Sequence, residues 1–180
     1  MFKSYMEVWK GDMYVNLQHE SFMTVPMTRE HAETVCGWTY ALPYDLYGWL
    51  PWSQMEALGV EFGDPEVRRS QYVSLLDADH ALCGFAQLFP LVGVTRLGVG
   101  MRPDLCGQGL GKSFMQAVVG AARENRPGDE IDLEVHTWNK RAIRAYEKSG
   151  FVIADTYPKL TPEGEQLFHC MVYEGPQRQL

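Results

Sequence analysis

The feature that most constrains this chain is a glycine-rich turn between a short apolar segment and an amphipathic helix. Residues 97–111 read L-G-V-G-M-R-P-D-L-C-G-Q-G-L-G. The apolar residues that follow at helical spacing are Leu110, Phe114, Val118 and Ala121. A strand, a glycine turn and a helix N-terminus together present free backbone N–H groups, which bind phosphate well. A ligand that carries phosphate is therefore the first hypothesis.

Two common phosphate motifs fit this turn only in part. Gly111, Lys112 and Ser113 match the end of a P-loop, but the first glycine of that motif falls on Cys106. The dinucleotide fingerprint G-x-G-x-x-G would start at Gly107, and it fails because its last glycine falls on Lys112. Taken alone, the turn leaves open a P-loop protein that binds ATP with magnesium, and also a turn without any ligand.

A second segment, residues 131–151, combines a strand pattern with a capped helix. It reads I-D-L-E-V-H-T-W-N-K-R-A-I-R-A-Y-E-K-S-G-F. The first six residues alternate between apolar and polar side chains, which predicts a strand. Asn139 suits the N-cap of a helix that ends before Gly150, and Phe151 begins another strand. The segment therefore predicts a strand, a helix and a strand in succession.

Together the two segments resemble the signatures of the GCN5-related N-acetyltransferase (GNAT) superfamily. The cofactor turn of that family, [RQ]-x-x-G-x-[GA], corresponds to residues 106–111, with Cys106 in place of the usual Arg or Gln. The second signature, N-x-x-A-x-x-x-Y-x-x-x-G-F, is matched at each position from Asn139 to Phe151. Around Glu134, the sequence L-E-V is similar to that of the ribosomal-protein alanine N-acetyltransferases. The resemblance covers roughly the C-terminal half of the chain.

This resemblance implies an α/β fold of the GNAT type, with a central mixed, mostly antiparallel sheet flanked by helices on both faces. It also implies acetyl-CoA as co-substrate, with backbone groups of residues 99–101 pairing with pantetheine and the turn holding the pyrophosphate. Gly98 and Gly100 suggest a β-bulge in that strand. The residues implied to bind the cofactor are Val99, Gly100, Met101, Gly107, Gln108, Gly109, Leu110, Gly111, Lys112 and Asn139.

The resemblance also implies a catalytic pair for direct attack of an amine on the thioester. Tyr146 would be the acid that protonates the departing thiolate, and Glu134 the base that deprotonates the amine through water. The competing interpretations are a packed phenol at Tyr146 and an ordinary solvated carboxylate at Glu134. Cys106 offers a thiol close to a helix N-terminus, but acyl transfer in this family needs no covalent cysteine. A catalytically weak module that binds CoA and acts as a sensor or interaction domain is the alternative function.

Residues 38–52 form a segment rich in aromatic side chains, W-T-Y-A-L-P-Y-D-L-Y-G-W-L-P-W. Together with Asp45, these rings would suit a cationic amine acceptor. Filling of the core is the competing interpretation for most of them. The six rings are Trp38, Tyr40, Tyr44, Tyr47, Trp49 and Trp52.

Length and composition narrow the class of protein, its compartment and its partners. The length of 180 residues suits one domain over 19–180 after an N-terminal extension at 1–18. We find no apolar stretch that would span a membrane and no secretory signal at the start. The four cysteines and five histidines are scattered, and the net charge is −7. We therefore expect a cytoplasmic enzyme without a metal, whose partner is a small-molecule amine or a peptide N-terminus. We expect no nucleic acid or membrane partner, and a homodimer is left open.

Apolar periodicity also predicts the remaining elements. The expected strands and helices occupy residues 22–26, 28–36, 53–58, 71–76, 82–89, 94–101, 151–156 and 167–173. Between the last two strands, Pro158, Pro162 and Gly164 predict a loop.

Overall fold

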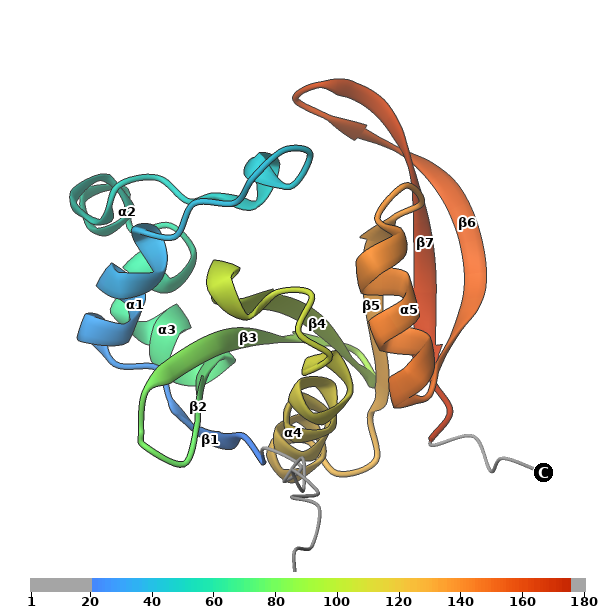
Figure 1. Cartoon of the computed structure of the whole chain (residues 1–180), viewed down its shortest axis with the longest axis horizontal. Helices are drawn as coiled ribbons and strands as arrows, with labels where there is room; N and C mark the ends of the chain where they lie inside the picture. The colour runs from blue at the N-terminus through green and yellow to red at the C-terminus, as the bar shows by residue number, and fades with distance from the viewer. Residues whose placement is uncertain (1–20, 176–180) are drawn as a thin grey trace, which may run out of the picture.

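Seven strands form one sheet in the order β1-β2-β3-β4-β5-β7-β6, and helices lie on both of its faces (Figure 1). The computed structural model describes residues 21–175, so the extension predicted at 1–18 lies outside the described residues. The elements are β1 (Met23–Pro26), α1 (Arg29–Cys36), α2 (Trp52–Leu58), α3 (Pro65–Gln71), β2 (Tyr72–Leu76), β3 (Leu82–Leu91), β4 (Val94–Met101), α4 (Gly111–Asn125), β5 (Glu130–His136), α5 (Lys140–Ser149), β6 (Phe151–Thr161) and β7 (Gly164–Tyr173). None of these helices is long and apolar enough to cross a membrane.

The central pair of strands, β4 and β5, is parallel, whereas all other neighbouring strands in the sheet are antiparallel. The helix α4 connects the two parallel strands, as a parallel crossover requires. Their pairing begins at Val94 opposite Glu130 and ends at Leu97 opposite Leu133. Beyond that point, residues 98–101 and 134–136 no longer pair with each other, so the sheet is open there. The mixed, mostly antiparallel sheet with helices on both faces confirms the predicted fold class.

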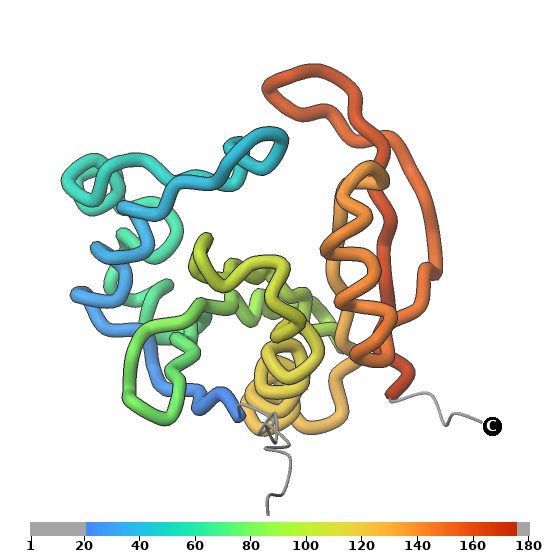
Figure 2. Tube along the Cα trace, viewed as in Figure 1, coloured from blue at the N-terminus to red at the C-terminus, as the bar shows by residue number. Residues whose placement is uncertain are grey.

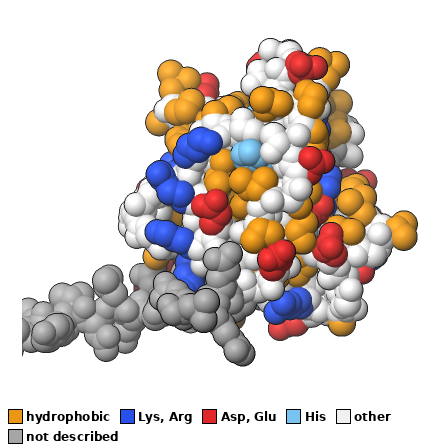
Figure 3. Space-filling view, turned by 90° about the vertical axis from the view of Figure 1, so that its right-hand side faces the viewer, with side chains coloured by type: hydrophobic (Ala, Val, Ile, Leu, Met, Phe, Trp, Pro, Cys, Tyr) orange, Lys and Arg blue, Asp and Glu red, His pale blue; other side chains and the backbone are white. Residues whose placement is uncertain are grey.

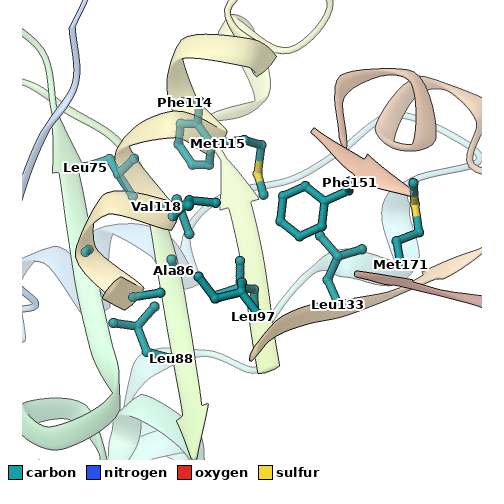
Figure 4. Close-up of a cluster of buried hydrophobic side chains, with 14 of the residues drawn as sticks. Leu75, Ala86, Leu88, Leu97, Phe114, Met115, Val118, Leu133, Phe151 and Met171 are labelled. Atoms are coloured by element: carbon teal, nitrogen blue, oxygen red, sulfur yellow. The ribbon is translucent and has the colours of Figure 1, made fainter. Parts of the chain in front are cut away.

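Two apolar clusters hold helices to the two faces of this sheet. Successive side chains on a strand point to opposite faces, and on β3 Phe85 joins one cluster while Ala86 joins the other. The larger cluster lies under α4 and α5, where Phe114, Met115 and Val118 pack against the strands (Figure 4). The smaller cluster holds α1 and α2 against the opposite face.

Local signals fix the start of α1 and both ends of α5, as the sequence predicts. The Thr28 hydroxyl accepts a hydrogen bond from the backbone N–H of His31, which starts α1. The side chain of Asn139 caps α5 by accepting from the N–H of Ala142 at 3.1 Å. Gly150 ends α5 with φ of 105°, a left-handed conformation that favours glycine.

Three features differ from the sequence prediction. The expected loop around Pro158 is part of a long β6–β7 hairpin, and proline is tolerated there because β6 lies at the edge of the sheet. The helix α3 was not predicted, although Asp64 caps it and Pro65 occupies its first position. No bulge interrupts the pairing of β3 with β4. Gly100 is needed there because a Cβ would lie 2.3 Å from the Phe85 ring.

Candidate active site

A cavity of about 920 Å³ lies where β4 and β5 separate, lined by residues 99–101 of one strand and 134–136 of the other. The proposed catalytic residues Tyr146 and Glu134 both line it. Gln108 is not among the lining residues, and its side-chain Nε2 donates to the carbonyl of Asp104 at 2.5 Å. The other residues expected to bind the cofactor all line this cavity: Val99, Gly100, Met101, Gly107, Gly109, Leu110, Gly111, Lys112 and Asn139.

The glycine turn leaves the start of α4 open to a ligand. Gly107 and Gly109 have φ of 82° and 85°, values that residues with a Cβ rarely adopt. At Gly111, glycine is required because of close packing: a Cβ at this position would lie 2.8 Å from the Cβ of Ala145 on α5. No side chain caps α4 at Leu110, so the first N–H groups of this helix are free for an anion.

Basic side chains line the cavity beside this turn. Lys112 lies in the first turn of α4. Arg141, Arg144 and Lys148 follow one another at three and four residues along α5, so they share one face of that helix. Sequence reasoning missed these three residues, although their spacing was a usable signal. Glu134 is the one acidic side chain among the lining residues that the structure describes. The cavity therefore has an excess of positive charge that suits a phosphate ligand.

Tyr146 lies on α5 in a partly buried position, with its ring centroid 6.1 Å from that of Phe151. Burial raises the pKa of the Tyr146 phenol well above its ordinary value, and the nearby Tyr47 adds to this effect. The phenol is therefore protonated at neutral pH. A protonated hydroxyl in the cavity wall can donate a hydrogen bond or a proton.

Glu134 is the centre of a network of hydrogen bonds and ion pairs. Its Oε1 accepts from the Arg96 guanidinium at 2.9 Å and from the Tyr157 hydroxyl, and its Oε2 lies 2.5 Å from the Lys159 ammonium. The same Arg96 makes a bidentate pair with Asp132 at 2.6 and 3.0 Å. Burial alone raises the pKa of Glu134, but the hydrogen bonds from Lys159 and Tyr157 and the nearby charges outweigh it and lower the pKa. The carboxylate is therefore ionised, and its charge is already compensated.

His136 occupies the same face of β5 as Glu134, two residues further along, and it also lines the cavity. Only 9% of this residue is exposed, and its Nδ1 has no hydrogen-bond partner among the described residues. Burial lowers the pKa of His136. The imidazole is therefore neutral at neutral pH. Its ring centroid lies 4.0 Å from that of Phe168.

The loop before α2 extends toward the start of α5 (Figure 2), and its residues Tyr44, Tyr47 and Trp49 line the cavity. The Nδ2 of Asn139 donates to the Tyr47 hydroxyl at 3.1 Å, and the Tyr44 ring lies 5.8 Å from that of Trp138. Both ends of the Asn139 amide are thus used within the protein, one for the helix cap and one for this loop.

Some rings of the aromatic segment, residues 38–52, line the cavity, and others pack in the core. Trp38 and Trp52 pack with the cluster under α1 and α2, and neither they nor Asp45 line the cavity. The Tyr44 ring is already covered by the Arg141 guanidinium, whose carbon lies 3.8 Å from the ring centroid. The rings that do line the cavity are Tyr40, Tyr44, Tyr47 and Trp49. A cage closed by Asp45 is therefore not formed.

A comparison of the sequence with models of known protein families identifies the family of this chain. Residues 27–151 match the family model of the acetyltransferase (GNAT) family. This chain belongs to the GNAT family.

Solved structures share the GNAT fold with this chain at low sequence identity. A spermidine N-acetyltransferase SpeG chimera from Vibrio cholerae and hSSAT is 14% identical, with a TM-score of 0.66 over 85% of this chain and 95% of that chain. The ribosomal-protein-S18-alanine N-acetyltransferase from Escherichia coli is 19% identical, with a TM-score of 0.59 over 88% and 96%. A GNAT-family acetyltransferase from Bacillus anthracis is 14% identical, with a TM-score of 0.69 over 85% and 94%. At these identities the likeness establishes the fold.

This chain departs from the GNAT turn signature at Cys106. The cysteine precedes the first residue of α4 by five positions, and its Sγ lies 3.7 Å from the carbonyl oxygen of Met101. Burial raises the pKa of the Cys106 thiol. This environment gives no support to a reactive thiolate. Within residues 21–175, no group of three or more His, Cys, Asp or Glu side chains is arranged to hold a metal ion.

Proposed function

We propose that this GNAT protein is an N-acetyltransferase that transfers the acetyl group of acetyl-CoA directly to an amine acceptor. The observation that carries the proposal is the cavity between the separated strands. It joins an uncapped helix N-terminus with a glycine turn, four basic side chains, the Tyr146 phenol and the Glu134 carboxylate. The named similar enzymes act on spermidine or on a ribosomal-protein alanine, and this supports an amine acceptor.

In the proposed cofactor site, the pyrophosphate binds at the turn of residues 107–112, where N–H groups and Lys112 are available. The pantetheine arm lies between β4 and β5, because residues 98–101 have backbone groups that β5 no longer pairs. An extended ligand can bind such a strand edge as an additional strand does. Asn139 and the basic face of α5 complete this site.

The proposed reaction is one direct displacement. The neutral amine attacks the thioester carbonyl carbon, and backbone N–H groups of residues 99–101 polarise the carbonyl oxygen. The C–S bond breaks, and the departing sulfur takes the proton of Tyr146. The nitrogen gives up its excess proton through water to Glu134, which is ionised and therefore able to accept it.

The first test is replacement of the proposed acid, Tyr146→Phe. We expect the rate constant of the chemical step to fall roughly 10²–10⁴-fold, the usual range for a general acid, while acetyl-CoA affinity measured by calorimetry stays the same. Release of free thiol and mass spectrometry of the acetylated amine would follow the reaction. Tyr173→Phe is the matched control, because Tyr173 packs on Phe151 outside the cavity.

Full activity of Tyr146→Phe would exclude the acid role. If the wild-type protein binds acetyl-CoA but acetylates neither small amines nor peptide N-termini, the alternative of a CoA-binding sensor or interaction module is favoured instead.

We also propose a cytoplasmic homodimer. All four cysteines are free in the structure, which is consistent with a reducing compartment. Hydrophobic side chains are exposed on the side of the molecule where β6 forms the sheet edge (Figure 3). On β6 and β7, the side chains of Ile153, Leu160 and Leu167 have exposed fractions of 44%, 83% and 53%. A second copy of the chain is the partner proposed for this surface.

A further inference from the structure

We propose that the acceptor is an arylalkylamine, which has a single ammonium group on a short chain attached to a flat ring, and that a polyamine is a poor acceptor. This inference rests on the proposed function and names the substrate class for the same cavity.

Rings form the wall of the cavity on the sheet face opposite α4 and α5. His136 and Phe168 are register partners on β5 and β7, with ring centroids 4.0 Å apart. Tyr47 lies 6.3 Å from His136, and Trp49 lies 6.0 Å from Phe85. All five side chains line the cavity. Flat apolar groups stack or pack edge-on against such rings, so this wall favours an acceptor with a ring of its own.

The charges in the cavity disfavour each additional ammonium group that an acceptor carries. Glu134 is the one carboxylate among the described lining residues, and Arg96 and Lys159 already pair with it at 2.9 and 2.5 Å. An ammonium group that leaves water without a carboxylate partner is strongly disfavoured. A polyamine would bring two or three such groups, and the described residues of this wall offer no free carboxylate for any of them, whereas a monoamine carries only the one amine that reacts in its neutral form.

The other cations that line the cavity further disfavour a polyamine relative to a monoamine. Lys112, Arg141, Arg144 and Lys148 all line the same cavity. Like charges repel across a partly enclosed cavity more strongly than in bulk water. The phosphates of a bound cofactor would neutralise some of these cations, but they would leave no excess of negative charge beside the ring wall.

His136 supplies polarity without charge. Its Nδ1 is buried and has no hydrogen-bond partner among the described residues, and its ring centroid lies 4.0 Å from that of Phe168 and 5.3 Å from that of Trp138. A neutral imidazole can accept a hydrogen bond from an amine and does not repel a single ammonium group. The ring wall therefore suits an acceptor with one amine on an apolar body.

The experiment compares three acceptors with wild-type protein and saturating acetyl-CoA: 2-phenylethylamine, butylamine and spermidine. We expect kcat/KM for 2-phenylethylamine to exceed that for spermidine by at least about 10-fold and to exceed that for butylamine as well. Phe168→Leu should lower kcat/KM for 2-phenylethylamine about 10-fold and change that for butylamine much less. Phe89→Leu removes an exposed ring of β3 outside the cavity and should change neither.

The wild-type comparison does not depend on any variant folding. A preference for spermidine, or for a peptide N-terminus without aromatic residues, would overturn the proposed acceptor class and leave acetyl transfer standing. The same holds if acetyl-CoA binds and 2-phenylethylamine is not acetylated while another amine is. Absence of acetyl-CoA binding by calorimetry would instead overturn the proposed function itself.

Discussion

Glu134 illustrates how neighbouring side chains decide what one carboxylate can do. Its sequence position suggests a free base, but the fold surrounds it with a guanidinium, an ammonium and a phenol. These three donors come from residues 38, 25 and 23 positions away in the chain. No local pattern around Glu134 could have predicted them, because the pairing depends on the register of β4, β5 and the β6–β7 hairpin.

The depressed pKa of Glu134 makes a prediction about stability and pH. The folded pKa lies below the ordinary value of 4.5, so folding favours the ionised form. The stabilisation is complete above the ordinary pKa and is lost as the pH falls through the lower, folded pKa. The difference in unfolding free energy between wild type and Glu134→Gln should therefore be constant at neutral pH and shrink below pH 4.5.

Urea unfolding at a series of pH values would measure this difference. Glu124→Gln, at an exposed position on α4, controls for the removal of one negative charge. A difference that grows as the solution becomes more acidic would contradict the ion-pair network around Glu134.

At the scale of elements, the turn before α4 joins fold and proposed function. Gly109 has φ of 85°, and a Cβ there would meet nothing within 4 Å. Gly109→Val should therefore destabilise the protein through backbone strain of about 1–3 kcal/mol. It should also abolish detectable acetyl-CoA binding by calorimetry, because the side chain would occupy the space in which the pyrophosphate approaches the turn.

Gly128→Val separates these two effects. Gly128 has φ of 96°, its Cβ would also meet nothing within 4 Å, and it lies outside the cavity. Both variants should lower the melting temperature, and only Gly109→Val should lose binding. Unchanged affinity in Gly109→Val would show that the pyrophosphate site is misplaced.

The elements also show which parts of the structure a sequence can predict. Capped helices and alternating strands, such as α1, α5 and β4, have local signals and were predicted within a few residues. The β6–β7 hairpin was missed because Pro158 and Gly164 favour loops unless the strand is known to lie at an edge. The gathering of Tyr146, Glu134 and the glycine turn in one cavity was expected from the GNAT resemblance, whereas the neutral His136 and the basic face of α5 were not.

For the molecule as a whole, charge is distributed unevenly. The net charge is −7, yet four basic side chains line the cavity against one carboxylate. Basic side chains also gather along one side of the face seen in Figure 3. A negatively charged ligand is therefore drawn to the cavity and repelled by much of the remaining surface.

This distribution predicts that acetyl-CoA binding weakens with salt. Raising ionic strength from about 0.1 M to about 1 M shortens the screening length from about 10 Å to about 3 Å. We expect the dissociation constant from calorimetry to rise over this range, and to rise less for Arg144→Gln. Lys140→Gln, on the same helix but outside the cavity, should keep the wild-type dependence. Salt-independent binding would argue against an electrostatic role for this helix.

The separation of β4 and β5 has a consequence for the lifetime of the protein in the cell. An interrupted ladder inside a sheet leaves unpaired backbone groups, and such edges can pair with other chains and start aggregation. Under the proposed function, acetyl-CoA would cover this edge and also stabilise the native state by mass action. The abundance of the protein would then follow the supply of its co-substrate, so that a starved cell would lose the enzyme together with the metabolite it consumes.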